Sequence, residues 1–285
     1  MIGRLVLAAV GGAIGFGTAR AVAAGRPVLD PQGRLDRPNH SGATVSLIEG
    51  PAVAAGLTAV ALAAARPRDR FAAVSTTAAA GLLGWVDDVL ETGSAKGLRG
   101  HLSALARGEI TTGGLKVLGI PAVSLLAAAV ARDPAPLLGS RLLGRCVDTV
   151  LAGGVVAGSA NLLNLLDLRP GRALKAGVIA VALGPVGSGS AALLGGGILG
   201  TAAATAPDDL AGRTMLGDTG ANALGAALGV RTALQAGRGE LLGTLALLVA
   251  LTLASEKVSF TRVIEATPGL RELDAWGRRP ADPGP

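Results

Sequence analysis

The chain is poor in the aromatic, charged and sulfur-containing side chains that usually build a soluble domain. Its 285 residues include three Phe, two Trp, no Tyr, two His and one cysteine, Cys146, and only 16% are charged. A soluble domain carries about 25% charged residues. A single cysteine excludes a disulfide scaffold, and a chain that is half hydrophobic does not belong to the disordered class. The composition therefore argues against a soluble enzyme.

Small apolar residues are abundant instead. Hydrophobic residues make up 50% of the chain, 44 residues are glycine, and the mean hydropathy is +0.52. Gly and Ala let helices approach closely in lipid, and one span needs about 20 apolar residues. Apolar stretches lie near residues 5–25, 47–65, 71–86, 114–131, 147–166, 173–187, 189–206, 219–237 and 240–255. The sequence thus predicts an all-α, polytopic integral membrane protein with nine or ten transmembrane helices in residues 1–255, followed by a tail, 256–285.

The positive charges indicate an orientation in the membrane. The net charge is +6, but the arginines are scattered between apolar runs, so no nucleic-acid partner is expected. With nine spans, and residues near span ends counted in the adjoining loop, the loops and tail on the tail side hold 16 Lys or Arg and the loops on the other side hold 8. Arg4, before the first span, and Arg20, within it, are not counted. The positive-inside rule then places the tail in the cytoplasm and the N-terminus outside the cell membrane. The arginine-rich loop 66–70, RPRDR, opposes this orientation.

Acidic residues gather at span ends on the predicted cytoplasmic face, in three segments: GWVDDVLE (84–91), NLLNLLDLRPG (161–171) and MLGDTGAN (215–222). Carboxylates at a bilayer boundary are costly and usually functional. Oxygen ligands on separate elements suit Mg²⁺, which also binds waters and substrate phosphates. The residues alone therefore predict a Mg²⁺-assisted reaction on a phosphate at the cytoplasmic face.

These segments resemble motifs of the polyprenyl-phosphate N-acetylhexosamine-1-phosphate transferases. This superfamily, glycosyltransferase family 4, includes phospho-N-acetylmuramoyl-pentapeptide transferase and the UDP-GlcNAc:polyprenyl-phosphate transferases. Asp87-Asp88 with Lys96-Gly97-Leu98 is similar to the family's paired aspartates and downstream KGL. Asn161, Asn164 and Asp167 match the start of NxxNxxDGxDGLA, and Leu216–Gly220 resembles the MGDxGS turn. RPNHSGATVSLIEGP (37–51) is a looser match to the family's first loop.

The resemblance implies a reaction and a set of site residues. A lipid phosphate, such as undecaprenyl phosphate, would attack a nucleotide sugar such as a UDP-sugar in envelope glycan synthesis, for example of peptidoglycan. Catalytic roles fall on Asp87, Asp88 and Asp218, with Asp218 and Asp88 as Mg²⁺ ligands. The expected substrate-binding residues are Arg37, Asn39, Lys96, Asn161, Asn164, Asp167, Gly217 and Asn222. Membrane lipid is the expected surrounding, and a homodimer is one expected assembly.

The chain departs from the family pattern on the nucleotide side. Pro170 stands where the family has a second aspartate, and Met215 where it has an aromatic residue. The His-rich last loop and the final span are missing. A first alternative is therefore a catalytically inactive relative that binds lipid phosphate or an envelope-synthesis partner. A second is a transporter or channel, a class that places its ionisable residues near the midplane of broken helices. The tail is expected either to form an amphipathic helix on the membrane or to be disordered.

The predicted orientation can be tested by labelling. A cysteine placed at Gly93, in a chain whose Cys146 is replaced by Ser, should be unreachable from outside by an impermeant thiol reagent, because the loop after the third span is cytoplasmic. Labelling of this cysteine in intact cells would show that the protein has the opposite orientation.

Overall fold

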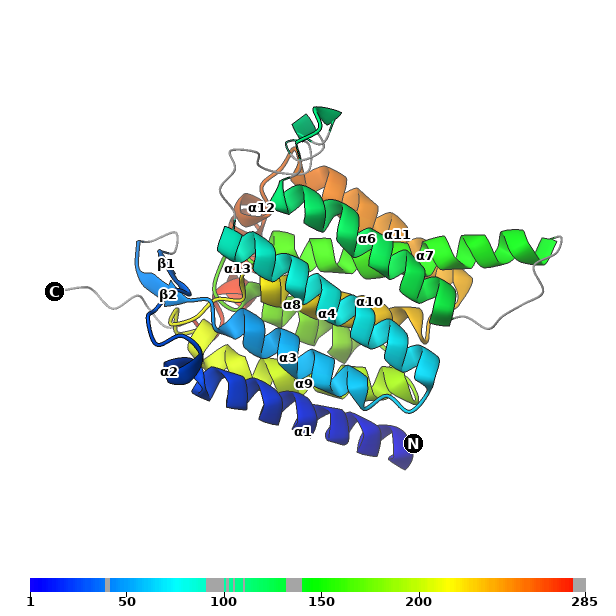
Figure 1. The fold of residues 1–285 in the computed structure, drawn as a ribbon, viewed down its shortest axis with the longest axis horizontal. Helices are drawn as coiled ribbons and strands as arrows, with labels where there is room; N and C mark the ends of the chain where they lie inside the picture. Colours follow the sequence, from blue (N-terminus) through cyan, green and yellow to red (C-terminus); the bar gives the residue numbers. More distant parts are fainter. Residues whose placement is uncertain are drawn as a thin grey trace.

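The computed structural model describes residues 1–38, 42–90, 100, 103–104, 106–109, 111–131 and 140–278. Within these ranges the chain forms twelve helices and two short strands (Figure 1). The elements are α1 (Ile2–Ala24), α2 (Arg26–Leu29), β1 (Asp36–Pro38), β2 (Thr44–Ser46), α3 (Glu49–Leu62), α4 (Pro67–Leu90), α6 (Thr112–Ala131), α7 (Ser140–Leu166), α8 (Arg172–Leu183), α9 (Ser190–Asp209), α10 (Gly217–Ala233), α11 (Arg238–Ser255), α12 (Phe260–Ala266) and α13 (Leu270–Ala275).

The predicted helical class is confirmed, and each predicted apolar stretch coincides with one helix of the bundle. Among the described residues, four helices are long and apolar enough to cross a membrane: Ile2–Ala24, Thr112–Ala131, Leu142–Leu166 and Arg238–Ser255. Nine full spans are not established. Helix α8, for example, has 12 residues, which rise about 18 Å against a hydrocarbon core of about 30 Å.

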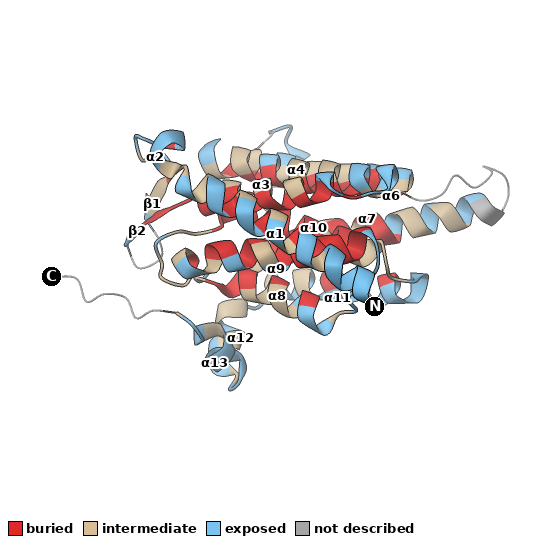
Figure 2. Ribbon diagram, turned by 90° about the horizontal axis from the view of Figure 1, so that it is seen from below, coloured by how far each residue is buried: buried red, intermediate tan, exposed pale blue. Residues whose placement is uncertain are grey.

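The bundle is built around α10. Almost every residue of this helix is buried, and it packs against α3, α4, α7, α8 and α9. Figure 2 shows the buried residues concentrated along these central helices, whereas the outer helices α1 and α11 carry exposed residues. The exposed side chains of α11 include Leu242, Leu247 and Leu253, each more than half exposed. Such an uncovered apolar surface is suited to contact with lipid rather than water.

Glycines allow two helices to touch backbone to backbone. A Cβ atom on Gly196 of α9 would collide with the carbonyl oxygen of Ala8 in α1, and one on Gly200 would collide with that of Gly12. A glycine seam of this kind is the membrane counterpart of a tightly packed core. It explains how a chain with few large side chains packs its helices closely.

A small hairpin, which the all-α prediction missed, covers one end of the bundle. β1 and β2 pair antiparallel, with Arg37 opposite Val45. Ser46 then connects the hairpin to the turn before α10: its N–H donates to Arg213 O (3.1 Å), and its carbonyl accepts from Met215 N (3.0 Å). Strands of three residues are too short to show a sequence pattern, but they fix the first loop beside the start of α10.

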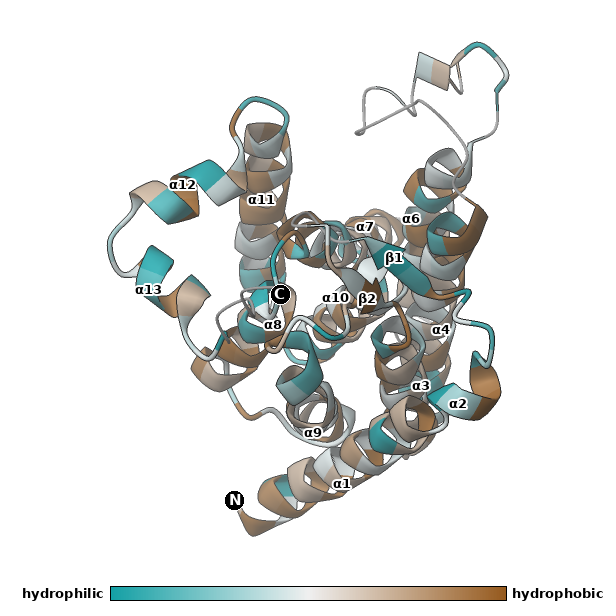
Figure 3. Ribbon diagram, turned by 90° about the vertical axis from the view of Figure 1, so that its left-hand side faces the viewer, coloured by the Kyte–Doolittle hydropathy of each residue, from teal (hydrophilic) through white to brown (hydrophobic). Residues whose placement is uncertain are grey.

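The tail packs on the same end of the bundle. The described part of the tail forms two short helices, α12 and α13, so it is helical rather than disordered. It packs against the protein itself, on α8. Arg172 donates to both carboxylate oxygens of Asp274, at 2.8 and 3.0 Å. Figure 3 looks onto this end, with the hairpin on one side of α10 and α12–α13 on the other.

The glycine seam can be tested by substitution. Gly196→Ala should lower the free energy of unfolding by about 1–3 kcal/mol, because the new methyl group forces α1 and α9 apart. Gly17→Ala in α1 is the matched control, since a Cβ there has no heavy atom within 4 Å. Thermal unfolding in detergent measures both variants, and equal midpoints would exclude close packing at the seam.

Candidate functional site

Lys116 joins three helices by ion pairs at the hairpin end of the bundle. Its ammonium group, in the first turns of α6, lies 2.7 Å from Oδ2 of Asp87 in the last turn of α4. It also pairs with Oδ2 of Asp218 in the first turn of α10. The side chains of Lys116 and Asp87 are 15% and 9% exposed. Charges removed from water to this degree need partners, and each of these carboxylates shares the same lysine.

Asp88 has a different environment from its neighbour Asp87. Its Oδ1 accepts the backbone N–H of Asp218 (2.9 Å), and its Oδ2 accepts both the N–H and the hydroxyl of Thr219, at 2.9 and 2.6 Å. Asp88 therefore caps the N-terminus of α10 from another helix. A carboxylate at this position satisfies free N–H groups and complements the helix dipole.

Gly217 is needed where α10 begins. Its φ of +58° lies in the left-handed region, which favours glycine. A Cβ atom there would also lie 2.9 Å from both carboxylate oxygens of Asp88. On the facing helix, a Cβ atom on Gly84 would collide with the carbonyl of Asp218. The glycines of the GWVDD and LGDTG segments thus let α4 approach the start of α10 closely enough for the cap to form.

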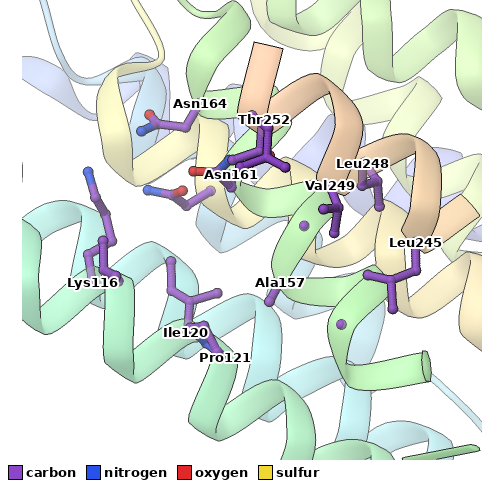
Figure 4. Close-up of a pocket in the computed structure, with 15 residues that line it drawn as sticks. Lys116, Ile120, Pro121, Ala157, Asn161, Asn164, Leu245, Leu248, Val249 and Thr252 are labelled. Atoms are coloured by element: carbon purple, nitrogen blue, oxygen red, sulfur yellow. The ribbon is translucent and has the colours of Figure 1, made fainter. Parts of the chain in front are cut away.

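A groove of about 350 Å³ leads away from Lys116 between α6 and α11, with α7 as its floor (Figure 4). Its polar end carries Lys116, Asn161, Asn164 and Asn222, while Ile120, Pro121, Leu245, Leu248 and Val249 line the rest. Asn161 donates to the hydroxyl of Thr252 in α11 (3.0 Å). Asn222 donates to the carbonyl of Asp218 (2.8 Å). The groove is amphipathic along its length.

The structure brings most of the predicted substrate-binding residues it describes close to this groove and cap. Asn161, Asn164 and Asn222 line the groove, and Gly217 forms the turn at the cap. Arg37 lies beside them, since its guanidinium donates to the backbone carbonyl of Asp88 (3.4 Å). Asn39 and Lys96 lie outside the described residues.

Asp167 belongs to a second acidic region on the same end. Burial raises the pKa of Asp167 well above its usual value, and the negative charges of Asp209, Asp218 and Asp88 raise it further. Glu49, at the start of α3, is 1% exposed. One of its oxygens accepts the hydroxyl of Thr214 (2.7 Å), and the other has no hydrogen-bond partner among the described residues.

The segment that departs from the family motif is held by the tail. Arg278 donates to the carbonyl of Pro170 (2.9 Å), and Gly171 N–H donates to Asp209 (2.9 Å). Burial raises the pKa of Asp274, but hydrogen bonds from Arg172 and Arg278 outweigh it and hold this pKa below its usual value. Arg172 is therefore occupied by Asp274 in the tail. The other departure, Met215, packs with Leu47 and Trp85 in a small apolar cluster.

The carboxylates at this end are candidate ligands for a metal ion. No group of three or more metal-ligating side chains is gathered closely enough among the described residues. Mg²⁺ requires fewer protein ligands, since one or two carboxylates suffice beside waters and substrate phosphates. Asp87 fits such a role, because its Oδ1 is buried without a hydrogen-bond partner in the described part of the chain. Asp218 faces the same lysine. The assignment of Asp88 as a ligand stays a prediction, and its hydrogen bonds give it a capping role in addition.

Two residues of this end were not singled out from the sequence. Lys116 lies in the glycine-containing segment GGLKVLG (113–119), and Glu49 lies in the first loop match. A sequence signal for Lys116 existed: it is the only charged residue in the apolar stretch 114–131. A lone charge in a span is costly and usually functional. Its partners lie on other helices and leave no local signal.

Comparison with known proteins does not assign the chain to a family. No family model matches it, and no curated protein matches it.

The cap on α10 can be measured by substitution. Asp88→Ala should destabilise the protein by about 1–2 kcal/mol, because the N–H groups of Asp218 and Thr219 lose their acceptor. Asp88→Asn retains one acceptor oxygen and should lose less. Denaturant or thermal unfolding in detergent gives the difference, and an Asp88→Ala protein as stable as the wild type would contradict the cap.

Proposed function

We propose that this protein transfers a sugar-1-phosphate from a nucleotide sugar to a polyprenyl phosphate, with Mg²⁺, at the cytoplasmic face of the cell membrane in envelope glycan synthesis. The observation that supports this proposal most directly is that Asp87 and Asp218 both pair with Lys116. These two acids come from separate motifs that resemble those of the transferases. A buried group of two carboxylates and one lysine at the mouth of a groove is suited to chemistry on a charged phosphate.

The groove supports the lipid acceptor. Lys116 and the three asparagines at its polar end can bind a phosphate group, while Ile120, Leu245 and Leu248 suit an isoprenoid chain. The neighbouring face of α11 carries exposed apolar side chains, so the lipid can enter from the bilayer. The polar end of the groove then holds the phosphate beside Asp87 and Asp218.

The proposed step is a displacement at phosphorus. An oxygen of the lipid phosphate attacks the phosphorus that carries the sugar. A new P–O bond forms, the bond to the pyrophosphate bridging oxygen breaks, and its electron pair leaves with the nucleoside monophosphate, UMP for a UDP-sugar. A bound Mg²⁺ would neutralise the pyrophosphate. Its proposed ligands are Asp218 and, in place of the Asp88 that the resemblance implies, Asp87, because both oxygens of Asp88 already accept hydrogen bonds from α10.

The protein's own groups position and balance charge. A phosphate monoester is already anionic near neutral pH, so Asp87 contributes more by orienting Lys116 and the acceptor than by removing a proton. Lys116 supplies positive charge in a site largely shielded from water, where electrostatic stabilisation is strong. Arg37 supplies a second positive charge, its guanidinium, beside Asp88.

The second candidate is a catalytically inactive relative that binds lipid phosphate. It is favoured by the α7–α8 loop, where Arg172 pairs with Asp274 and Pro170 accepts from Arg278. Those hydrogen bonds hold the segment that the family motif leads us to expect at the nucleotide. The two functions differ in one measurable property, the release of a nucleoside monophosphate.

The experiment uses the purified full chain in detergent with Mg²⁺, undecaprenyl phosphate and a panel of UDP-, CDP- and GDP-sugars. Release of a nucleoside monophosphate that depends on the lipid supports the transferase and identifies the donor. If no donor gives release while the lipid phosphate still binds, the transferase is excluded and the inactive relative is supported.

Asp218→Asn should reduce this release at least about a hundredfold and abolish Mg²⁺ binding, because it removes a charge from the phosphate site. The fold should persist in detergent. Asp208→Asn is the matched control: this acid also lies at the hairpin end, but it pairs with Arg213 on the surface. Full activity of the Asp218→Asn protein would remove Asp218 from the site.

A further inference from the structure

A second pocket lies at the opposite end of the bundle. It measures about 300 Å³ and lies between α4, α6, α7 and α10. Its lining includes Asp69 in the first turn of α4, whereas Asp87 of the candidate site lies in the last turn. Asp87 lies 18 positions after Asp69, which is a rise of about 27 Å along the helix. That distance is close to the thickness of a hydrocarbon core, so a membrane that held the candidate site at one face would hold this pocket at the other.

The charged side chains that line this pocket, among the described residues, are Arg66 and Asp69. Arg66 lines it, is exposed, and makes no side-chain hydrogen bond or ion pair within the described residues. It begins the loop RPRDR, whose charge opposes the predicted orientation. The guanidinium of Arg70 already has a partner, because its Nε donates a hydrogen bond to the carbonyl of Ala64 (2.9 Å). A free guanidinium at a membrane boundary is a natural partner for a lipid phosphate.

Ser124 of α6 supplies an unused donor in the same lining. It is 1% exposed, and its hydroxyl has no hydrogen-bond partner among the described residues. Helical serines and threonines usually donate to a carbonyl one turn earlier. Ser75 and Thr76 do so here, to Phe71 O (2.6 Å) and Ala72 O (2.7 Å). A buried hydroxyl without such a bond is costly, and a ligand in the pocket would satisfy it.

The remaining lining decides which anionic group fits. Alanine methyl groups form much of the wall, from Ala72, Ala127, Ala128, Ala131, Ala152, Ala233 and Ala236. They suit the first methylene groups of a lipid's acyl chains. Asp69 also lines the pocket and accepts the hydroxyl of Ser190 (2.8 Å). A carboxylate there favours a headgroup that offers hydroxyl donors together with a single phosphate.

We propose that this pocket binds the phosphate headgroup of an anionic, hydroxyl-bearing membrane lipid, with Arg66 on the phosphate and Ser124 as a hydrogen-bond donor. Lipid binding gives a role to loop 66–70, which takes no part in the proposed transfer reaction. The lipid site does not depend on the proposed function, since it lies at the other end of the bundle from Asp218.

The test measures binding to the full chain in detergent by native mass spectrometry and thermal shift. The probes are dihexanoylphosphatidylglycerol, dihexanoylphosphatidylcholine and inorganic phosphate. One equivalent of phosphatidylglycerol should bind, and Arg66→Gln should weaken binding about tenfold through loss of a charged hydrogen bond. Ser124→Ala should weaken it severalfold. Arg4→Gln, in the first turn of α1, and Asp218→Asn should leave it unchanged; the N-terminal end of α1 lies at this end of the bundle (Figure 1).

Three outcomes would overturn the proposal. Phosphatidylglycerol could bind the Arg66→Gln and wild-type proteins equally, which would remove the guanidinium from the site. Phosphatidylcholine could bind as tightly, which would show no preference for an anionic lipid. Inorganic phosphate could bind as tightly as the lipid, which would identify a soluble anion as the ligand.

Discussion

The ammonium group of Lys116, shared between Asp87 and Asp218, is the interaction on which the candidate site depends. Two carboxylates buried side by side would repel each other, and each would lose hydration. The lysine compensates both and joins the last turn of α4, the first turns of α6 and the start of α10. Three sequence segments that are far apart thereby become one charged centre. The polar end of the groove lies beside this centre because Lys116 is part of both.

The close approach that permits this centre comes from small residues. Asp88 reaches the N–H groups of α10 only because Gly84 and Gly217 leave room between the two backbones. The same device joins α1 to α9, where glycines face each other. A chain with few aromatic residues therefore gains its rigidity from backbone contact, caps and ion pairs. The tail adds a further ion pair, because Arg172 and Asp274 form one that is largely buried.

Sequence patterns predicted the parts of the fold that depend on local information. The apolar stretches gave every helix of the bundle, and the acidic motifs placed Asp87, Asp88 and Asp218 at one end. Span length was less accessible, because α8 has only 12 residues and ends at Leu183, whereas the apolar stretch continues to residue 187. The hairpin was missed because its strands have three residues each. Lys116 was missed because its role depends on partners in α4 and α10, and the anchoring of Arg172 depends on a residue 102 positions away.

The assignment of the cation site can be tested most directly with Mn²⁺ in place of Mg²⁺, observed by electron paramagnetic resonance on the purified protein with polyprenyl phosphate. Asp87 has a buried oxygen without a partner in the described chain, whereas both oxygens of Asp88 accept hydrogen bonds from α10. The proposed site therefore predicts that bound Mn²⁺ is lost in Asp87→Asn and in Asp218→Asn and is retained in Asp88→Asn. Bound Mn²⁺ that persists in Asp87→Asn and disappears in a folded Asp88→Asn protein would contradict it.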